Sequence, residues 1–399
     1  MEKKSKNIGK KWIYWFSFAM AVILIYKVLD NYSEIKDWIS NFFRIIMPFV
    51  IGIIIAYLLY LPSKKIENVY KKVKLIRKKS RLLSVMTVYI IAIVLFLLII
   101  RFVVPIISQS IVDLVNNFQN YYNLTVEKIN ELPDDSPLKS EYLINLVKEF
   151  KNIDLKQFVN VEKLTKYAQG AISIASGIFD FFVSIIVSVY ILLERTEIVR
   201  FIKKLTKSIF DEDIYNNINK YFDRTNEIFL KFLASQFLDA IVVGILTSVA
   251  MSIMGVKYGV LLGFLIGLFN MIPYFGAIIA VTISIIITFL TGGISQAIWM
   301  AVVVIILQQI DANIINPKIV GDSLKISPLL VIFAVTIGGA YFGFLGMFLA
   351  VPIVAVIKIV LIDYINYKEK TKKFEIVNTE KIKNINNKFY DKKVNTKGK

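Results

Sequence analysis

The sequence predicts an all-α, polytopic membrane protein with six to eight spans, two of them broken or re-entrant helix pairs in the C-terminal half. Of its 399 residues, 56% are hydrophobic, and the mean hydropathy is +0.62. Apolar runs of about 20 residues, the length that crosses a hydrocarbon core, recur along the chain. The chain has no Cys and no His. This excludes disulfides, imidazole or thiolate metal sites and histidine-dependent catalysis.

Residues 1–107 form an N-terminal region with three predicted spans, Trp12–Leu29, Phe42–Leu61 and Leu82–Ile107. No small-residue cleavage pattern follows the first apolar run, so we expect a retained span. The loop between the second and third spans carries nine Lys and Arg against one acid, Glu67. Because basic loops stay on the cytoplasmic side, we expect this loop and the N-terminus to be cytoplasmic.

Residues 108–170 are predicted to form an extracytoplasmic amphipathic helical hairpin. Apolar residues recur there at helical spacing, at Ile111, Val115, Phe118, Tyr122, Val126 and Ile129. The stretch PDDSP at 133–137 interrupts the pattern, and a second amphipathic run covers Tyr142–Phe150. Two placements stay open: a surface for a second copy of the chain or for the membrane, and a cap packed on the chain itself.

Residues 171–231 supply a fourth span, Ala171–Leu193, and a cytoplasmic amphipathic helix. The tail, residues 363–399, carries eleven Lys against five acids. We expect the tail to be cytoplasmic, largely disordered and attracted to anionic lipids. Basic residues beside apolar spans act as topology signals, so nucleic acid is not an expected partner despite the net charge of +18.

Residues 232–362 are predicted to form a transport core made of two similar units. In the first, the span Phe232–Met254 is followed by an apolar segment, Tyr258–Leu290, that the stretch NMIPYFG at 270–276 interrupts. Proline removes a backbone donor and clashes with the preceding turn. The carbonyl groups freed near Phe269 must then be buried in protein or face a wet cavity.

The second unit repeats this plan. The span Ile298–Ile315 precedes the segment Pro328–Ile362, which contains a Gly-Gly pair at 338–339 and YFG at 341–343. Both spans carry Gln-x-x-Asp, at 236–239 and 308–311. A span followed by a broken helix, twice, is typical of transporters built on an inverted repeat. Half-helices of about 13 residues reach only about 20 Å, which favours re-entrant hairpins over full crossings.

Glycines recur every four residues at the start of the first broken helix, at Gly255, Gly259, Gly263 and Gly267. We expect them on one helix face, where another backbone packs closely. Ionisable groups at membrane depth are costly and therefore functional candidates. The predicted substrate- or ion-binding residues come from the two spans and the first break: Gln236, Asp239, Asn270, Pro273, Tyr274, Gly276, Gln308, Gln309, Asp311 and Asn313.

The candidate residues admit more than one role. Asp239 lies about eight residues into its span, where it could bind a cation, carry a proton or make a structural contact. Asp311 and Asn313 sit either in the site or at the membrane interface. The helix ends flanking Asn270 offer free carbonyl and N–H groups, and Tyr274 could hydrogen-bond a polyol. Asp180 is expected to make a helix or subunit contact.

Four stretches resemble the autoinducer-2 exporter family: SQFLDAIVVGIL, GVLLGFLIGLFNMIPYFGAIIA, LQQIDANIINPKIVG and the closing GFLGMFLAVPI. The resemblance implies a multi-span permease that exports small molecules, including autoinducer-2. Some members are monovalent cation/proton antiporters, and one branch is associated with sporulation. The chain departs from the family pattern at Ala277, where proline is usual, and at Asp239, where many members are apolar. The matching motif residues are Gln236, Asn270, Pro273, Gly276, Gln309, Asn313, Pro317, Pro328, Gly343, Gly346 and Pro352.

The predicted function is therefore secondary transport without a cofactor, not catalysis. We expect export of a small polar solute across the bacterial plasma membrane, coupled to an ion gradient, with both termini cytoplasmic. The alternatives are exchange of sodium or another monovalent cation for protons, and a non-transporting, sporulation-associated scaffold. A homo-oligomer is compatible with each of them. No GxxxxGK[ST] motif for ATP and no Gly-x-Gly-Asp motif of an intramembrane protease occurs.

Overall fold

The fold is described from a computed structural model of the 399-residue chain. It describes residues 12–131 apart from 13, 24–25 and 28–29, isolated positions between 133 and 164, and residues 178–320 and 326–395. The predicted run Tyr142–Phe150 and the start of the predicted fourth span fall mostly outside these residues. The chain divides into two units, one of residues 1–59 and 174–195 and one of residues 60–173 and 196–399.

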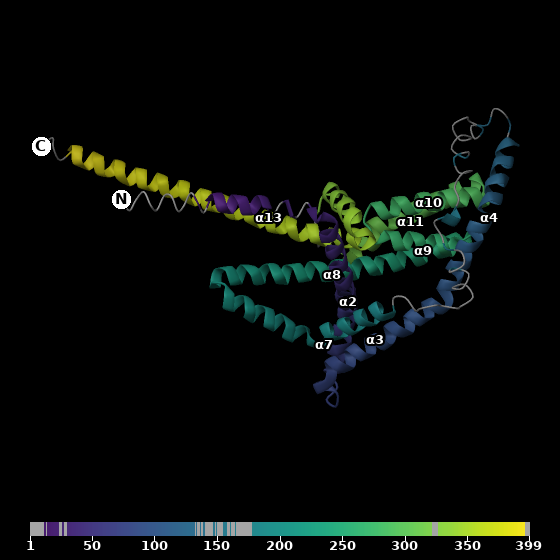
Figure 1. The fold of residues 1–399 in the computed structure, drawn as a ribbon, viewed down its shortest axis with the longest axis horizontal. Coiled ribbons are helices and arrows are strands. Elements are labelled where there is room, and N and C mark those ends of the chain that lie inside the picture. Colours follow the sequence, from purple (N-terminus) through teal and green to yellow (C-terminus); the bar gives the residue numbers. More distant parts are fainter. Residues whose placement is uncertain are drawn as a thin grey trace. The chain divides into compact units, whose positions relative to one another are not determined.

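All elements in the described part of the chain are helical, and Figure 1 labels the main ones. Two short 3-10 turns, Arg77–Lys79 and Leu155–Gln157, and two π-helical segments, Ile99–Val103 and Asp311–Ile315, accompany the α-helices. The α-helices are α2 (Tyr32–Tyr70), α3 (Ser80–Leu98), α4 (Val104–Asn130), α7 (Ile178–Ile209), α8 (Glu212–Ile253), α9 (Gly259–Asn270), α10 (Phe275–Gly292), α11 (Ile294–Ile310), α12 (Asn316–Val320) and α13 (Pro328–Asn395).

Six of the described helical segments are long and apolar enough to cross a membrane. Together with the family assignment reported below, this agrees with the predicted all-α polytopic membrane protein. Two shorter apolar helices, Tyr14–Ile23 and α9, cover the first predicted span in part and the first half of the first broken helix. The six long segments are Ser33–Tyr70, Arg77–Asn130, Glu212–Ile253, Phe275–Gly292, Ile294–Lys318 and Pro328–Glu369.

The smaller unit brings the N-terminal part of α2 against the start of α7. At Gly52 the two helices approach so closely that a Cβ atom would lie 2.8 Å from the carbonyl oxygen of Ser184. Ser184 itself is buried and donates its hydroxyl to the carbonyl of Asp180 over 2.7 Å. The lack of a side chain at Gly52 thus permits a close helix–helix contact of the kind common in membranes.

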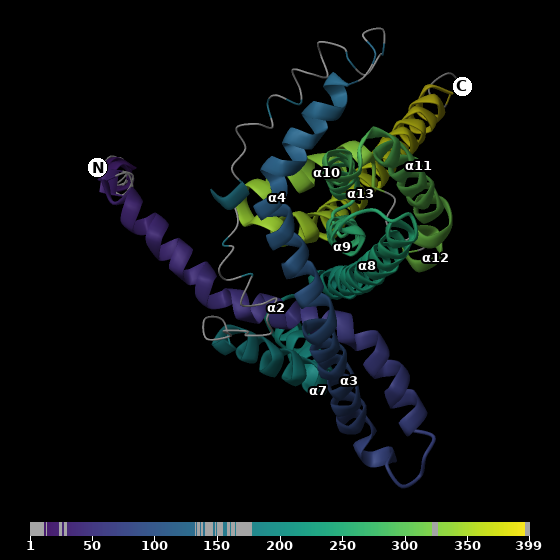
Figure 2. The ribbon, with the colours of Figure 1, turned by 90° about the vertical axis from the view of Figure 1, so that its right-hand side faces the viewer.

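The larger unit contains the predicted transport core. Its helices α8, α9, α10 and α11 lie side by side, and α4 runs across the end at which α9 begins (Figures 1 and 2). The side chains shared by these four helices form one apolar core, with Met251, Leu262, Ala280 and Met300 among its buried members. The core therefore holds the first broken helix against both neighbouring spans.

The first break is a helical hairpin, as expected. Helix α9 ends at Asn270, α10 begins at Phe275, and the two helices pack against each other. Tyr274 between them adopts a φ of 66°, which residues with a Cβ atom seldom adopt. A Cβ atom on Gly276 would lie 1.6 Å from the carbonyl oxygen of Phe269, so only glycine fits there. The reversal thus depends on more than Pro273.

The second break also reverses the chain, at Gly343 inside α13. Gly343 has φ 59° and ψ −144°, a conformation open essentially only to glycine. A Cβ atom on Gly346 would lie 2.0 Å from the carbonyl oxygen of Gly338, eight residues earlier in the chain. A straight helix would separate these residues by about 12 Å. The two halves of α13 therefore fold back on each other, and the Gly-Gly pair allows their contact rather than making the turn.

Helix α4 forms the first part of the segment 108–170, for which the sequence leaves two placements open. Leu114, Phe118 and Tyr121 form a buried cluster with Leu290 of α10. The hydroxyl of Thr125 also donates to the carbonyl of Leu290 over 3.3 Å. The apolar face of α4 thus packs on the first hairpin of the same chain. Ile129 and Tyr122 continue this face.

Two expectations need correction. The tail after Ile362 is not largely disordered where it is described, because α13 continues to Asn395. No Gly or Pro lies between Ile353 and Lys397, so the sequence contains no helix breaker there. Gly255 does not share the helix face of the other glycines: it has a φ of 66° in the turn before α9. Gly263 and Gly267 do pack on α8, against Ser248 and Gly244.

Candidate functional site

Asp239 occupies the middle of α8 and is fully buried, with an exposed fraction of 0%. One turn earlier on the same helix face, Gln236 is buried as well, with 5% exposed. Residues three apart lie next to each other on an α-helix, so the Gln-x-x-Asp spacing places both side chains towards the same neighbours. Those neighbours are the first break and the end of α11.

Asn270, the last residue of α9, joins the polar groups of three elements. Its side-chain amide donates to Oδ2 of Asp239 over 2.8 Å and to Oδ2 of Asp311 over 3.4 Å. Its backbone carbonyl accepts a hydrogen bond of 2.7 Å from Nε2 of Gln236. The carbonyl of Phe269, predicted to lose its partner, accepts the N–H of Ile272 over 2.8 Å instead. The side chain of Gln236 therefore satisfies one carbonyl group that the break frees.

Asp311 begins the π-helical segment that ends the predicted span, and it is buried, with 5% exposed. Its carboxyl group accepts from the same Asn270 amide as the carboxyl group of Asp239, so the two carboxyl groups are neighbours. A π-helical turn inserts one extra residue into a helix and often marks a functional site. The placement of Asp311 beside Asn270 and Asp239 is therefore internal to the unit rather than at its surface.

One oxygen of each carboxyl group is left without a partner. Oδ1 of Asp239 and Oδ1 of Asp311 are buried and accept no hydrogen bond from the described residues. Two ionised carboxylates side by side in a buried place repel each other, and each loses its hydration. A proton or a cation between them would remove both costs. Asn270 donates to one oxygen of each carboxyl group.

The other predicted site residues divide into three groups. Nε2 of Gln308, one turn before Asp311, is buried without a hydrogen-bond partner among the described residues. Gln309 and Asn313 are exposed and pair with each other, since Nδ2 of Asn313 donates to the Gln309 carbonyl over 2.8 Å. They do not join the buried group. Tyr274 is 51% exposed, and Pro273 and Gly276 shape the turn.

Sequence reasoning missed two polar contacts at the ends of α8. At one end Lys220 and Arg224 meet Asp363 of α13. At the other, the turn before α9 brings Lys257 and Tyr258 to α4. In α4, Asp113 lies between the apolar positions Ile111 and Val115, where a polar residue is expected, so the sequence pattern did not single it out.

Comparisons with known proteins agree on one family. A family model described as AI-2E family transporter matches residues 14–366. The "Putative transport protein YrrI" of Bacillus subtilis is 25% identical over 365 residues, which are 89% of this chain and 96% of that protein. The "Putative permease PerM" of Escherichia coli is 24% identical over 323 residues, covering 80% of this chain and 87% of its own. The match thus extends over nearly the whole chain.

Proposed function

The chain belongs to the AI-2E transporter family, and from this premise we propose that it is a secondary transporter that exports a small polar solute, coupled to the movement of a monovalent cation or proton. The observation that carries the proposal is the buried pair Asp239 and Asp311, which Asn270 bridges at a break in a helix. Ionisable groups in such a position default to a role in transport or proton relay.

Three features of the site support coupling at the carboxyl pair. Three elements hold the pair: α8, the end of α9 and the π-helical segment that follows α11. Each carboxyl group has one buried oxygen without a hydrogen-bond partner in the described part of the chain. Binding of a proton or cation there would change the electrostatic cost of holding the three elements together. Occupancy of the pair and the arrangement of the first hairpin would therefore be linked.

The solute itself would bind beside the same break. The ends of α9 and α10 present backbone groups, and Tyr274 and Gln308 add side-chain hydrogen-bonding capacity. Such a lining suits a small molecule with several hydroxyl or carbonyl groups. We place the protein in the bacterial plasma membrane, with both termini in the cytoplasm, because the loop of residues 62–81 and the tail are strongly basic. Anionic lipids are the expected neighbours of those basic segments.

A second function is favoured by the same carboxyl pair: exchange of sodium or another monovalent cation for protons with no organic solute. Two carboxylates that alternate between a proton and a cation suffice for such an exchange. The exchanger and the solute exporter differ in one measurable respect. An exchanger moves protons whenever a cation gradient is imposed, and an exporter moves them only when its solute is present.

The test is flux in proteoliposomes under imposed proton and sodium gradients, with a panel of small polar solutes. Gradient-driven movement of a solute that stops in Asp239→Asn supports the exporter. Cation-driven proton movement without any solute supports the exchanger. The matched control is Asp180→Asn, which removes an exposed carboxylate on α7. Protein that is correctly inserted and moves neither solute nor cation would contradict both proposals and leave a scaffold.

A further inference from the structure

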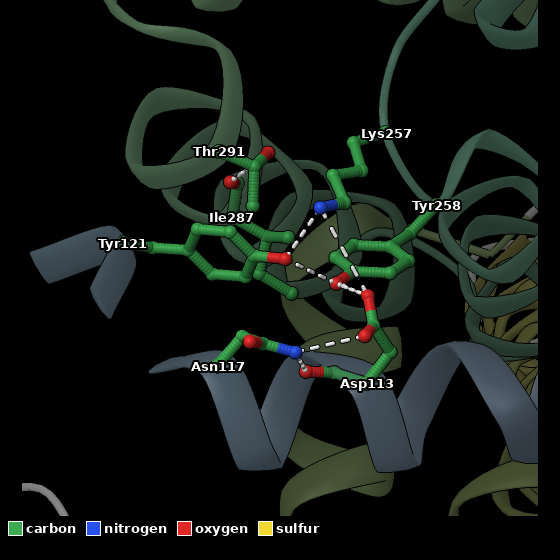
Figure 3. A network of polar contacts seen from close by, with 7 residues as sticks. All are labelled: Asp113, Asn117, Tyr121, Lys257, Tyr258, Ile287 and Thr291. Carbon is green, nitrogen blue, oxygen red and sulfur yellow. Dashed lines mark hydrogen bonds and ion pairs between the residues drawn. The ribbon is translucent and has the colours of Figure 1, made fainter. Parts of the chain in front are cut away.

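A cluster of four polar side chains ties α4 to the start of α9. Tyr258 donates its hydroxyl to Oδ2 of Asp113, and the Tyr121 and Tyr258 hydroxyl groups lie 2.8 Å apart. Nζ of Lys257 donates to the Tyr121 hydroxyl over 2.5 Å and lies 3.9 Å from Oδ2 of Asp113. Figure 3 shows these groups converging from α4 and from the turn before α9. We call Asp113, Tyr121, Lys257 and Tyr258 the α4 clasp.

The α4 clasp is held in a specific geometry. Tyr258 adopts a left-handed conformation, with φ 65° and ψ 24°, which a bulky residue adopts only when its surroundings hold it there. Nζ of Lys257 lies 4.6 Å from the centre of the Tyr121 ring, at cation–π distance. Burial, and then the hydrogen bonds to Asp113 and Tyr121, raise the pKa of the Tyr258 phenol, so it remains a donor. Asn117 fixes the accepting carboxylate through Nδ2, 2.8 Å from Oδ1 of Asp113.

A second polar contact lies at the opposite end of α8. Asp363 of α13 pairs through Oδ2 with Nζ of Lys220 over 3.0 Å and with Arg224 over 3.4 Å. Between this contact and the middle of α8, Phe232 and Phe348 pack with ring centres 6.0 Å apart. The second half of α13 therefore runs along the first half of α8. We call Lys220, Arg224 and Asp363 the α13 clasp.

The two clasps flank the buried carboxyl pair almost symmetrically. Asp239 lies fifteen residues after Arg224, about 22 Å along the helix, and fourteen residues before the end of α8, about 21 Å. Each clasp joins α8, or the turn that follows it, to a different partner helix. Both clasps are formed at once in this structure. A transporter needs its site to open to one side at a time.

We propose that the α4 clasp and the α13 clasp are the two gates of the transport cycle, each controlling access to Asp239 and Asp311 from one side of the membrane. The proposal rests on the proposed transport function. The charged side chains of Lys220, Arg224 and Lys257 are exposed, so water and solute can replace their contacts at little cost. The apolar core between them stays packed while either gate opens. Breaking one clasp opens the site to that side only.

Access to the site can be measured directly, because the natural chain has no Cys. Ser235→Cys places one thiol on α8, one turn from Asp239, at a position that is 8% exposed. A membrane-impermeant maleimide is applied to the full-length protein in right-side-out and inside-out vesicles. Tyr258→Phe is expected to raise labelling about tenfold from the side of the α4 clasp. Losing one hydrogen bond to a carboxylate shifts a two-state equilibrium by about that factor.

Asp363→Asn is expected to raise labelling about two- to fivefold, from the other side only, because an exposed ion pair contributes less than a partly buried hydrogen bond. Two control variants leave the clasps intact: Tyr122→Phe removes the hydroxyl of a neighbouring buried tyrosine on α4, and Glu227→Gln removes an exposed ion pair with Lys231 on α8. Neither control should change labelling. Unchanged labelling in both clasp variants, or an equal rise from both sides in either one, would overturn the proposal.

Cross-linking gives a second readout that does not depend on the hydroxyl or carboxylate variants. Asp113→Cys with Tyr258→Cys, or Arg224→Cys with Asp363→Cys, is combined with the thiol at residue 235. After the initial labelling rate of that thiol is known, the pair is bridged with a bifunctional methanethiosulfonate reagent, because a direct disulfide is too short to replace these long side chains. The closed bridge should abolish labelling from its own side, and reductant should restore it. Labelling that persists from that side contradicts the gate. These readouts need no solute, so absent flux with side-specific labelling would contradict the proposed function and leave the gates standing.

Discussion

Asn270 donates its side-chain amide to Asp239 over 2.8 Å, although 31 residues separate the two in the chain. The contact places a carboxylate from the middle of one helix against the broken end of another. Asp311 reaches the same amide from a third element, over 3.4 Å. A helix break that would be costly in a membrane is thus satisfied by the residues that could hold a transported charge.

Replacing Asp239 by Asn should abolish coupled flux while the protein still inserts. The variant keeps the size of the side chain but removes the charge that a proton or cation would neutralise. We expect solute or cation flux in proteoliposomes to fall to the level of empty vesicles. Asp180→Asn should transport normally. Coupled flux equal to that of the natural protein in Asp239→Asn would exclude Asp239 as the coupling carboxylate.

Replacing Gln236 by Ala should destabilise the protein, because the Asn270 carbonyl then loses its 2.7 Å hydrogen bond. A buried carbonyl left without a partner costs about 1–3 kcal/mol. We expect a lower midpoint of thermal unfolding in detergent. Gln119→Ala, at an exposed position on α4, is the control. An equal midpoint for the two variants would mean that the break does not need Gln236.

Replacing Gly276 by Ala should disrupt the first hairpin. The added Cβ atom would meet the Phe269 carbonyl oxygen at 1.6 Å, and this backbone atom cannot move without opening the turn. We expect a loss of about 3 kcal/mol or more in stability, seen as low expression and early thermal aggregation. Ala277→Ser at the next position should be tolerated. Full stability of Gly276→Ala would contradict the hairpin geometry.

Replacing Gly343 by Ala should weaken the second hairpin for a different reason. Nothing lies within 4 Å of an added Cβ atom there, but the conformation with φ 59° is strained for any residue that has one. The expected loss is about 1–3 kcal/mol. Limited proteolysis near residue 343 should detect a loosened turn. Proteolysis at the natural rate would show that the chain can reverse without glycine.

Local sequence signals predicted the elements and the two breaks well, and long-range contacts poorly. Apolar runs and the proline at 273 mark the first hairpin directly. The second turn was harder to place, because the Gly-Gly pair at 338–339 and Gly343 carry similar local signals. One of them allows close packing and the other makes the reversal. Only the packed structure distinguishes these roles.

The site was predicted residue by residue but not as a group. Spacing alone could show that Gln236 and Asp239 share a helix face. Spacing also separates Asp311 from Gln309 and Asn313, which lie on the opposite side of a regular helix. It could not show that the face of Asp311 turns inwards, because this depends on which helices pack against α11. Sequence periodicity assumes a regular helix and therefore did not predict the π-helical segment that begins at Asp311.

The carboxyl pair should behave as a unit in a double-mutant experiment. If Asp239 and Asp311 hold one positive charge between them, removing either carboxylate already destroys the binding site. The double variant Asp239→Asn with Asp311→Asn should then lose no more sodium- or proton-dependent flux than the more damaging single variant. Residues that share a partner commonly show such non-additivity. Independent sites would instead give losses that multiply.

The measurement is initial flux per inserted protein at several sodium concentrations and pH values, with Asp180→Asn as reference. Multiplying losses would separate the two carboxylates into different steps, and Asp239 alone would then remain the candidate for coupling.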